Sequence, residues 1–182
     1  MSHYTYILSQ WGGGYTMQEC RLGLNTFTVS FIGHRIIENP LRIEKQLEAL
    51  IRRLMHEKEY VVFLVVRDGE FDQIVSSVIR RCKRVIRDDN SAHVWVLPYP
   101  STDFRDNEAA YRDYYDEIEI CAISAEGHFK NAYQTRNREM VDRSNLVVFC
   151  IQHENGGAWQ TMKYVQKISA AYLNLNEKRE NI

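Results

Sequence analysis

The sequence lacks an apolar run long enough to cross a bilayer, because none of its hydrophobic stretches approaches the roughly 20 residues that a spanning helix needs. It also lacks an N-terminal basic segment leading into an apolar one, so no signal peptide is predicted. The four cysteines, Cys20, Cys82, Cys121 and Cys150, include no C-x-x-C pair, which disfavours a zinc site and favours reduced thiols. We therefore expect a cytoplasmic protein with no membrane contact and no metal site.

An excess of one charge is also missing. The chain has 23 basic and 24 acidic residues in 182, a formal net charge of −1, so no overall field attracts a polyanion. The basic face at Arg80, Arg81, Lys83 and Arg84 has no aromatic residues between its charges and is interpreted as a solvated helix surface. Nucleic acid is therefore not expected as a partner.

Three motifs of nucleotide and acyl chemistry are absent. There is no G-x-x-x-x-G-K-[ST] loop and no G-x-G-x-x-G after the first predicted strand, which disfavours an ATPase or a dinucleotide dehydrogenase. No G-x-S-x-G elbow for a serine hydrolase is present either. No cofactor is implied, and no residue is assigned a catalytic role.

Buried strands alternating with amphipathic helices are what the sequence does contain. Continuous apolar runs predict strands buried on both faces, and apolar residues at helical spacing predict the helices between them. Strands are predicted at 27–32, 60–66, 92–97, 118–123 and 146–151. Helices are predicted at 40–57, 71–87, 106–115 and 130–143, and a final one continues from Gly156-Gly157 to Leu175.

This alternation predicts an α/β fold, a three-layer α/β/α Rossmann-like sandwich with a mainly parallel five-stranded sheet and the 27–32 strand at its centre. Residues 27–175 form the predicted ligand-binding domain. Residues 1–26 are interpreted as an appendage that is either loosely packed or disordered or adds an edge strand, and residues 176–182 as a polar tail. A homo-oligomer is compatible with this organisation.

The loops that follow the strands are predicted to meet at one rim of the sheet, although they are far apart in sequence. Gly156-Gly157 opens a helix there, and free N–H groups at a helix N-terminus suit a phosphate. The candidate ligand-binding residues are Gly33, His34, Arg35, Gly69, Asp72, Arg136, Asn137, Gly156, Gly157 and Thr161.

Several of these residues keep two interpretations. His34 either contacts a phosphate, or acts as an acid or base, or is a hydrogen-bonded structural histidine. Asp72 either caps a helix or binds a ribose hydroxyl. Arg136 and Arg138 point to different sides of their helix, and Arg136 is the one predicted to face the ligand.

Four segments together resemble the SLOG superfamily, which unites the lonely-guy phosphoribohydrolases with the DNA-processing protein of natural transformation. They are Phe31-Ile32-Gly33-His34-Arg35, Gly69-x-Phe71-Asp72, Arg136-Asn137-x-x-Met140-Val141-Asp142-x-Ser144 and Gly156-Gly157. The likeness covers about residues 27–175 and is nearest to YpsA-like bacterial members. It implies a Rossmann-like fold that binds a nucleotide or a nucleotide-derived, phosphoribosyl-containing ligand at the strand ends, as a sensor or regulator.

One difference from the lonely-guy enzymes favours a binding protein over an enzyme. Lonely-guy enzymes use a glutamate in the loop after the double glycine, whereas this chain has Met162 and Lys163 there. The alternative function is a hydrolase or transferase acting on an N-glycosidic bond of a nucleotide. It requires another acidic residue at the ligand: Glu70, Asp72 or Glu154.

Overall fold

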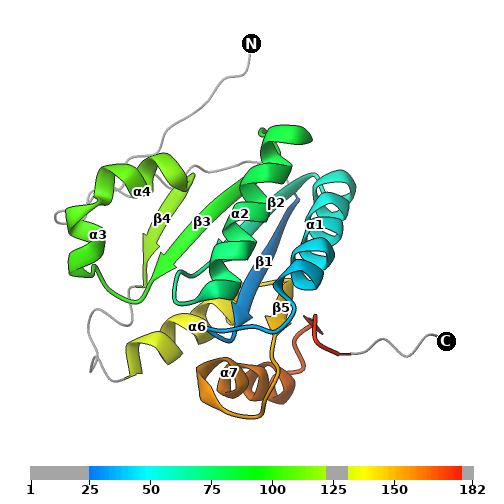
Figure 1. The fold of residues 1–182 in the computed structure, drawn as a ribbon, viewed down its shortest axis with the longest axis vertical. Helices are drawn as coiled ribbons and strands as arrows, with labels where there is room; N and C mark the ends of the chain where they lie inside the picture. The colour runs from blue at the N-terminus through cyan, green and yellow to red at the C-terminus, as the bar shows by residue number, and fades with distance from the viewer. Residues whose placement is uncertain (1–24, 122–130, 178–182) are drawn as a thin grey trace.

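The computed structural model describes residues 25–121 and 131–177, which form an α/β sandwich around one parallel sheet (Figure 1). Every strand pair in the sheet is parallel, and the strand order is β4-β3-β2-β1-β5-β6. The strands are β1 (Thr26–Gly33), β2 (Tyr60–Val65), β3 (Ser91–Leu97), β4 (Glu117–Ile120), β5 (Leu146–Cys150) and β6 (Tyr172–Asn174). The predicted parallel sheet with the first strand inside it is confirmed.

Helices connect the strands and cover both faces of the sheet. They are α1 (Pro40–Glu57), α2 (Glu70–Val85), α3 (Thr102–Asp106), α4 (Glu108–Tyr114), α6 (Ala132–Asp142) and α7 (Gly156–Lys167). Pro40 occupies the first turn of α1, where its missing N–H costs nothing. The short helix predicted at 106–115 is two helices, α3 and α4, with the first capped by the Ser101 hydroxyl.

Neighbouring residues of one strand face different layers, which fixes the sides of the sandwich. Phe31 and Phe63 pack with α1 and α2 in the largest hydrophobic cluster. Ile32 packs with α7, and Leu64 lies in a cluster with Met140 of α6. This alternation explains why β2 and β5 are apolar throughout their length.

The sheet has six strands, so the prediction of five is wrong, and so is the prediction of a final helix reaching Leu175. Helix α7 ends at Lys167, and Ser169 has a φ of 56°, a left-handed conformation that turns the chain back. Tyr172–Asn174 then pairs with β5 as β6. The apolar residues after Lys167 happened to continue the helical spacing.

Asn174 and Leu175 attach β6 to the rest of the domain. The Asn174 side chain is buried, and its Oδ1 accepts from Ile151 N at 3.1 Å, so it fixes β6 beside β5. Leu175 is buried in the largest cluster. The predicted appendage up to residue 24, the strand positions at 122–123 and the tail from 178 lie outside the described residues.

Candidate functional site

A cavity of about 510 Å³ opens at the carboxyl ends of the central strands, beside the first turns of α6 and α7. This is the crevice in which open parallel α/β sheets hold ligands. Eight of the predicted ligand residues line it: Gly33, His34, Arg35, Asp72, Arg136, Asn137, Gly156 and Gly157. Gly69 and Thr161 are not among its lining residues.

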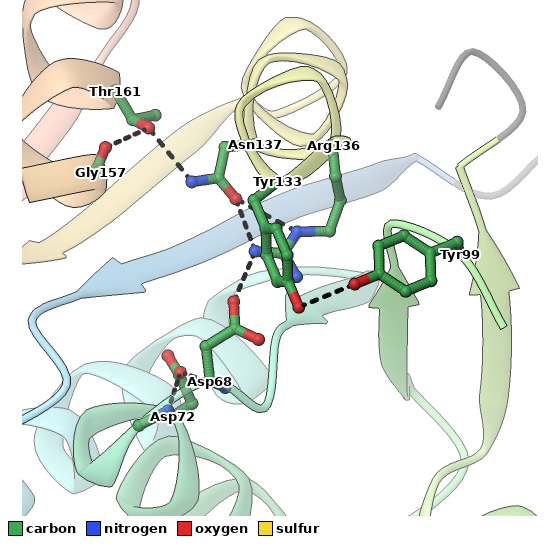
Figure 2. A network of polar contacts seen from close by, with 9 residues as sticks. Asp68, Asp72, Tyr99, Tyr133, Arg136, Asn137, Gly157 and Thr161 are labelled. Atoms are coloured by element: carbon green, nitrogen blue, oxygen red, sulfur yellow. Dashed lines mark hydrogen bonds and ion pairs between the residues drawn. The ribbon is translucent and has the colours of Figure 1, made fainter. Parts of the chain in front are cut away.

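Asp72 performs the capping role and also faces the cavity. Its Oδ2 accepts from the backbone N–H groups of Asp68 and Gly69, both at 2.9 Å, which closes the turn between β2 and α2 (Figure 2). Its Oδ1 has no partner although Asp72 is only 4% exposed. The pKa of this carboxyl is raised from 3.8 to about 7, chiefly by burial and also by the neighbouring Asp68 carboxylate, against the opposing effects of the backbone bonds and Arg136.

Arg136 lies at the cavity but already has an acidic partner. Its Nη2 donates to Asp68 Oδ2 at 2.7 Å and to Asn137 Oδ1 at 2.9 Å, and its side chain is 2% exposed. The Tyr133 ring covers the guanidinium at 5.3 Å from the ring centroid (Figure 2). Arg138, the residue not chosen, lies instead over the Tyr164 ring. The placement of Arg136 at the cavity was predicted, but its pairing with Asp68 was not.

Asn137 and Thr161 form a support behind the cavity. The Asn137 amide donates to Thr161 Oγ1 at 3.2 Å, and that hydroxyl donates to Gly157 O at 3.0 Å (Figure 2). Arg136 is therefore connected through two side chains to the first turn of α7. These polar atoms make hydrogen bonds to one another. Thr161 therefore holds the first turn of α7 in position, and its contact with a ligand stays a prediction.

His34 is a hydrogen-bonded structural histidine, the last of its three interpretations. Its Nδ1 accepts from Gln152 N at 3.2 Å, which leaves Nε2 protonated to donate to Asn155 O at 3.3 Å. Burial lowers the pKa of the ring, and the stacked His153, with ring centroids 3.8 Å apart, lowers it further. Both nitrogens therefore hold the loop that leads into α7, and neither is directed to acid–base chemistry.

Two of the glycines are required by packing rather than by a ligand. A Cβ at Gly33 would lie 2.3 Å from a ring carbon of Phe71, and one at Gly69 would lie 2.4 Å from Arg35 Cα. The first lets α2 approach β1, and the second lets the turn after β2 approach the loop after β1. Gly69 therefore makes a close approach to backbone, and its contact with a ligand stays a prediction.

The first turn of α7 borders the cavity and has no side-chain cap. The side chain of its N-cap, Asn155, makes no capping hydrogen bond, and Gly156, Gly157 and Ala158 line the cavity. Gly156 has a φ of +79°, which favours glycine, and a Cβ there would meet no atom within 4 Å. Open space in front of uncapped N–H groups is what a phosphate at a helix N-terminus needs.

Sequence reasoning missed three cavity residues that matter: Asp68, Tyr133 and Ile36. Asp68 lies in the loop after β2, as the chosen His34 and Arg35 lie in the loop after β1, so its place in the fold could have identified it. Tyr133 lies one turn before Arg136 on α6 and is 42% exposed. Its helical spacing from Arg136 was available, but an exposed ring has no signal of its own in the sequence.

Neither a metal site nor a membrane-spanning helix is found among the residues that the structure describes. Within residues 25–121 and 131–177, no group of three or more His, Cys, Asp or Glu side chains is arranged to hold a metal ion. None of the helices in this part of the chain is long and apolar enough to span a membrane.

Comparison with known proteins gives matches by structure only. No family model matches the sequence, and no curated protein matches it. DNA processing protein A from Streptococcus pneumoniae aligns with a TM-score of 0.60 and 13% identity, over 86% of this chain and 52% of that chain. DNA processing protein A from Helicobacter pylori, which binds single-stranded DNA, aligns with a TM-score of 0.59 and 15% identity, over 85% and 67%.

These likenesses confirm the fold that the resemblance implied. The narrower likeness to YpsA-like members is not confirmed. This chain spans about half the length of the Streptococcus pneumoniae protein.

The expectation that nucleic acid is not a partner is wrong. It relied on the net charge of −1, yet a protein with this fold, the one from Helicobacter pylori, binds single-stranded DNA. Net charge describes the whole surface of a protein, whereas a single DNA strand is bound by the local electrostatic field of one groove.

Proposed function

We propose that the cavity binds a nucleotide or a nucleotide-derived, phosphoribosyl-containing ligand, and that the protein acts as a sensor or regulator of it. The observation that carries the proposal is that Asp72, whose Oδ1 atom is buried without a partner, lines the same cavity as the uncapped first turn of α7. A buried carboxyl oxygen without a partner is costly, and a ligand hydroxyl would satisfy it.

The phosphate is assigned to the first turn of α7. The N–H groups around Gly156 and Gly157 carry the positive end of the helix dipole, and Arg35 lies at the cavity as an exposed cation. A phosphate there lies at the end of the cavity that Thr161 and Asn137 brace.

The sugar and the base are assigned to the remaining walls. A ribose hydroxyl can donate to Asp72 Oδ1, and with a pKa of about 7 this carboxyl can also donate when it is protonated. The exposed Tyr133 ring and the Ile36 side chain give the apolar surface that a base requires. The cavity volume of about 510 Å³ lies within the range of small-molecule sites.

The test is a thermal-shift titration with the nucleoside 5′-monophosphates. A ligand that binds only the folded state at about 100 times its Kd adds about 2.7 kcal/mol, or roughly 5–10 °C in Tm for a domain of this size. Gly157→Asp should remove the shift, because its carboxylate lies where the phosphate binds.

Gly157→Ala is the matched control for that variant. Its Cβ would lie 3.1 Å from Gln134 Nε2, the mobile end of a side chain, and it adds no charge. Position 156 is unsuitable, because a φ of +79° would strain any replacement. The proposal is wrong if no nucleotide shifts the wild type, or if both variants bind equally well.

A second candidate is single-stranded DNA, favoured by the Helicobacter pylori neighbour. A DNA strand would place one phosphodiester at the first turn of α7 and one base on the Tyr133 ring. The cavity proposed for a nucleotide would then also bind single-stranded DNA. Anisotropy with a labelled oligothymidylate would detect it, and binding that weakens steeply with salt and with Gly157→Asp would assign it to this site.

The enzymatic alternative now has a candidate acid. Glu70 is turned away, since its Oε2 accepts from Ile37 N at 3.1 Å, and Glu154 does not line the cavity. Asp68 and Asp72 do line it. Cleavage of an N-glycosidic bond would appear as free base released from a bound nucleotide, and loss of that release in Asp72→Asn would support the alternative.

A further inference from the structure

The cavity contains an ion pair whose charges cancel before any ligand arrives. Arg136 Nη2 and Asp68 Oδ2 are 2.7 Å apart, and Arg136 is 2% exposed while the Asp68 side chain is 30% exposed. The guanidinium is further enclosed by Asn137 Oδ1 and by the Tyr133 ring. The carboxylate of Asp68 is therefore the more exposed member of the pair.

We propose that Asp68 restricts this cavity to nucleotides that carry a single phosphate. This inference rests on the proposed function and adds the phosphate number to it. The monophosphate binds at the first turn of α7, and the part of the cavity in front of Asp68 and Asp72 takes neutral, hydroxyl-bearing groups. Asp68 is thus a specificity-determining residue.

The physical reason is the sign of the charge that a second phosphate would meet. Arg136 would be the natural cation for that phosphate, since it is linked through Asn137 and Thr161 to the first turn of α7. Asp68 already holds its guanidinium, so a second phosphate must displace a carboxylate or lie beside it. Like charges brought together at low dielectric oppose binding strongly.

A second observation agrees with a cavity in which this pair has no net charge. At Asp72, the Asp68 carboxylate raises the pKa and the Arg136 guanidinium lowers it, so their effects on the neighbouring group oppose each other. Removal of the Asp68 charge would leave Arg136 as an uncompensated cation beside the ligand.

The experiment titrates adenosine, guanosine, cytidine and uridine mono-, di- and triphosphates by calorimetry into the wild type and Asp68→Asn. The wild type is expected to bind a monophosphate more tightly than its di- and triphosphate, and equal affinities would contradict the inference. In Asp68→Asn, which keeps the side-chain shape, the affinity for the diphosphate relative to the monophosphate should rise by about tenfold or more.

Asp103→Asn is the matched control, because it changes the net charge by the same amount from α3, outside the cavity lining. It should leave the ratio of di- to monophosphate affinity unchanged. An equal rise in both variants would mean that overall charge sets the ratio, and the inference would be wrong.

A second variant covers the case in which Asp68→Asn does not fold. The double variant Asp68→Asn with Arg136→Gln removes both charges, which is less costly than burying one alone. Because the double variant removes the carboxylate that opposes a second phosphate, its ratio of di- to monophosphate affinity should rise above that of the wild type, although by less than in Asp68→Asn, which also frees a cation; an unchanged ratio would overturn the inference. If no monophosphate binds the wild type, the proposed function fails as a whole. If a monophosphate binds and Asp68→Asn leaves the ratio unchanged, only the inference fails.

Discussion

The polar residues around the cavity and those around Lys83 lie at opposite ends of the same sheet. The cavity network joins Asp68, Asp72 and Arg136 at the carboxyl ends of the strands. At the other end, Lys83 donates to Ser91 O at 3.1 Å and to Asp116 Oδ2 at 2.5 Å. Each contains a charged side chain that is almost fully buried.

The Lys83 cluster also leaves polar atoms unsatisfied, namely Ser91 Oγ and the neighbouring His93 Nδ1. Neither residue lines the cavity, whereas Asp72 does. An unsatisfied buried atom therefore marks a functional site only where a ligand can reach it. Elsewhere, the same observation describes a local cost that the fold tolerates.

The two ends respond to pH in opposite directions. Burial lowers the pKa of His93 to about 3, with the charges of Lys83 and Arg80 contributing, so the folded state excludes a proton that the unfolded state binds. Asp72 keeps a proton that the unfolded state releases. Variants at the two positions therefore separate contributions that cancel in the wild type.

The largest expected effect is that of His93→Gln, which keeps a polar partner for Ser76. In the wild type, the contribution of His93 is fully present above pH 6.5 and is lost as pH falls towards 3, on the order of 5 kcal/mol in all. Urea unfolding between pH 7.5 and 4.5 should show the variant losing less stability than the wild type. Parallel curves would mean that His93 is protonated normally.

Asp72→Asn should have a nearly equal effect of the opposite sign. Because the folded pKa is about 7 and the ordinary value is 3.8, the wild type loses stability as pH rises between these values, on the order of 4 kcal/mol. The free energy of unfolding of the variant, relative to the wild type, should increase from pH 4 to pH 8. Asp113→Asn, an exposed change on α4, serves as the control and should show no such trend.

Lys83→Met should lower the free energy of unfolding by a smaller amount and should leave the nucleotide affinity unchanged. It keeps the hydrocarbon of a side chain that is 9% exposed but removes the donor to Ser91 O and Asp116, at a cost of about 2 kcal/mol. Urea unfolding at pH 7.5 would measure it, with the exposed Lys45→Met as control. A weaker nucleotide affinity in folded Lys83→Met would contradict the separation of the two ends.

The comparison also shows which features could be predicted from sequence. The apolar runs at 60–66 and 146–151 have the length and the β-branched content of strands buried on both faces, and parallel strands bring their following loops to one edge. The meeting of Gly33, Asp72, Arg136 and Gly157 at one cavity follows from that topology, without knowledge of any contact. The sixth strand could not be predicted in this way, because Tyr172 and Leu175 continue the helical period and only Ser169 interrupts it.

Partner choice within the site could not be predicted. Arg136 is 68 residues from Asp68, and no pattern relates the two until the sheet places the loop after β2 beside α6. The same holds for His34, whose ring nitrogens are bound to backbone atoms of Gln152 and Asn155. Side-chain chemistry indicates what a residue is able to do, but the role it takes depends on neighbours that the fold supplies.

The smallest expected effect is that of His153→Ala. His153 is exposed and stacks on His34, so its removal should change the free energy of unfolding by no more than about 0.5 kcal/mol. It should raise the pKa of His34 towards its ordinary value, because the charge of His153 is one cause of the lowered pKa.

NMR titration of the His34 ring protons would measure that change. Burial, the larger cause, stays in the variant, so the pKa should remain below 6.5. A pKa at or above 6.5 would show that the ring is free to leave Gln152 N and Asn155 O. His34 would then be available to a ligand phosphate, and the loop before α7 would have to be held by something else.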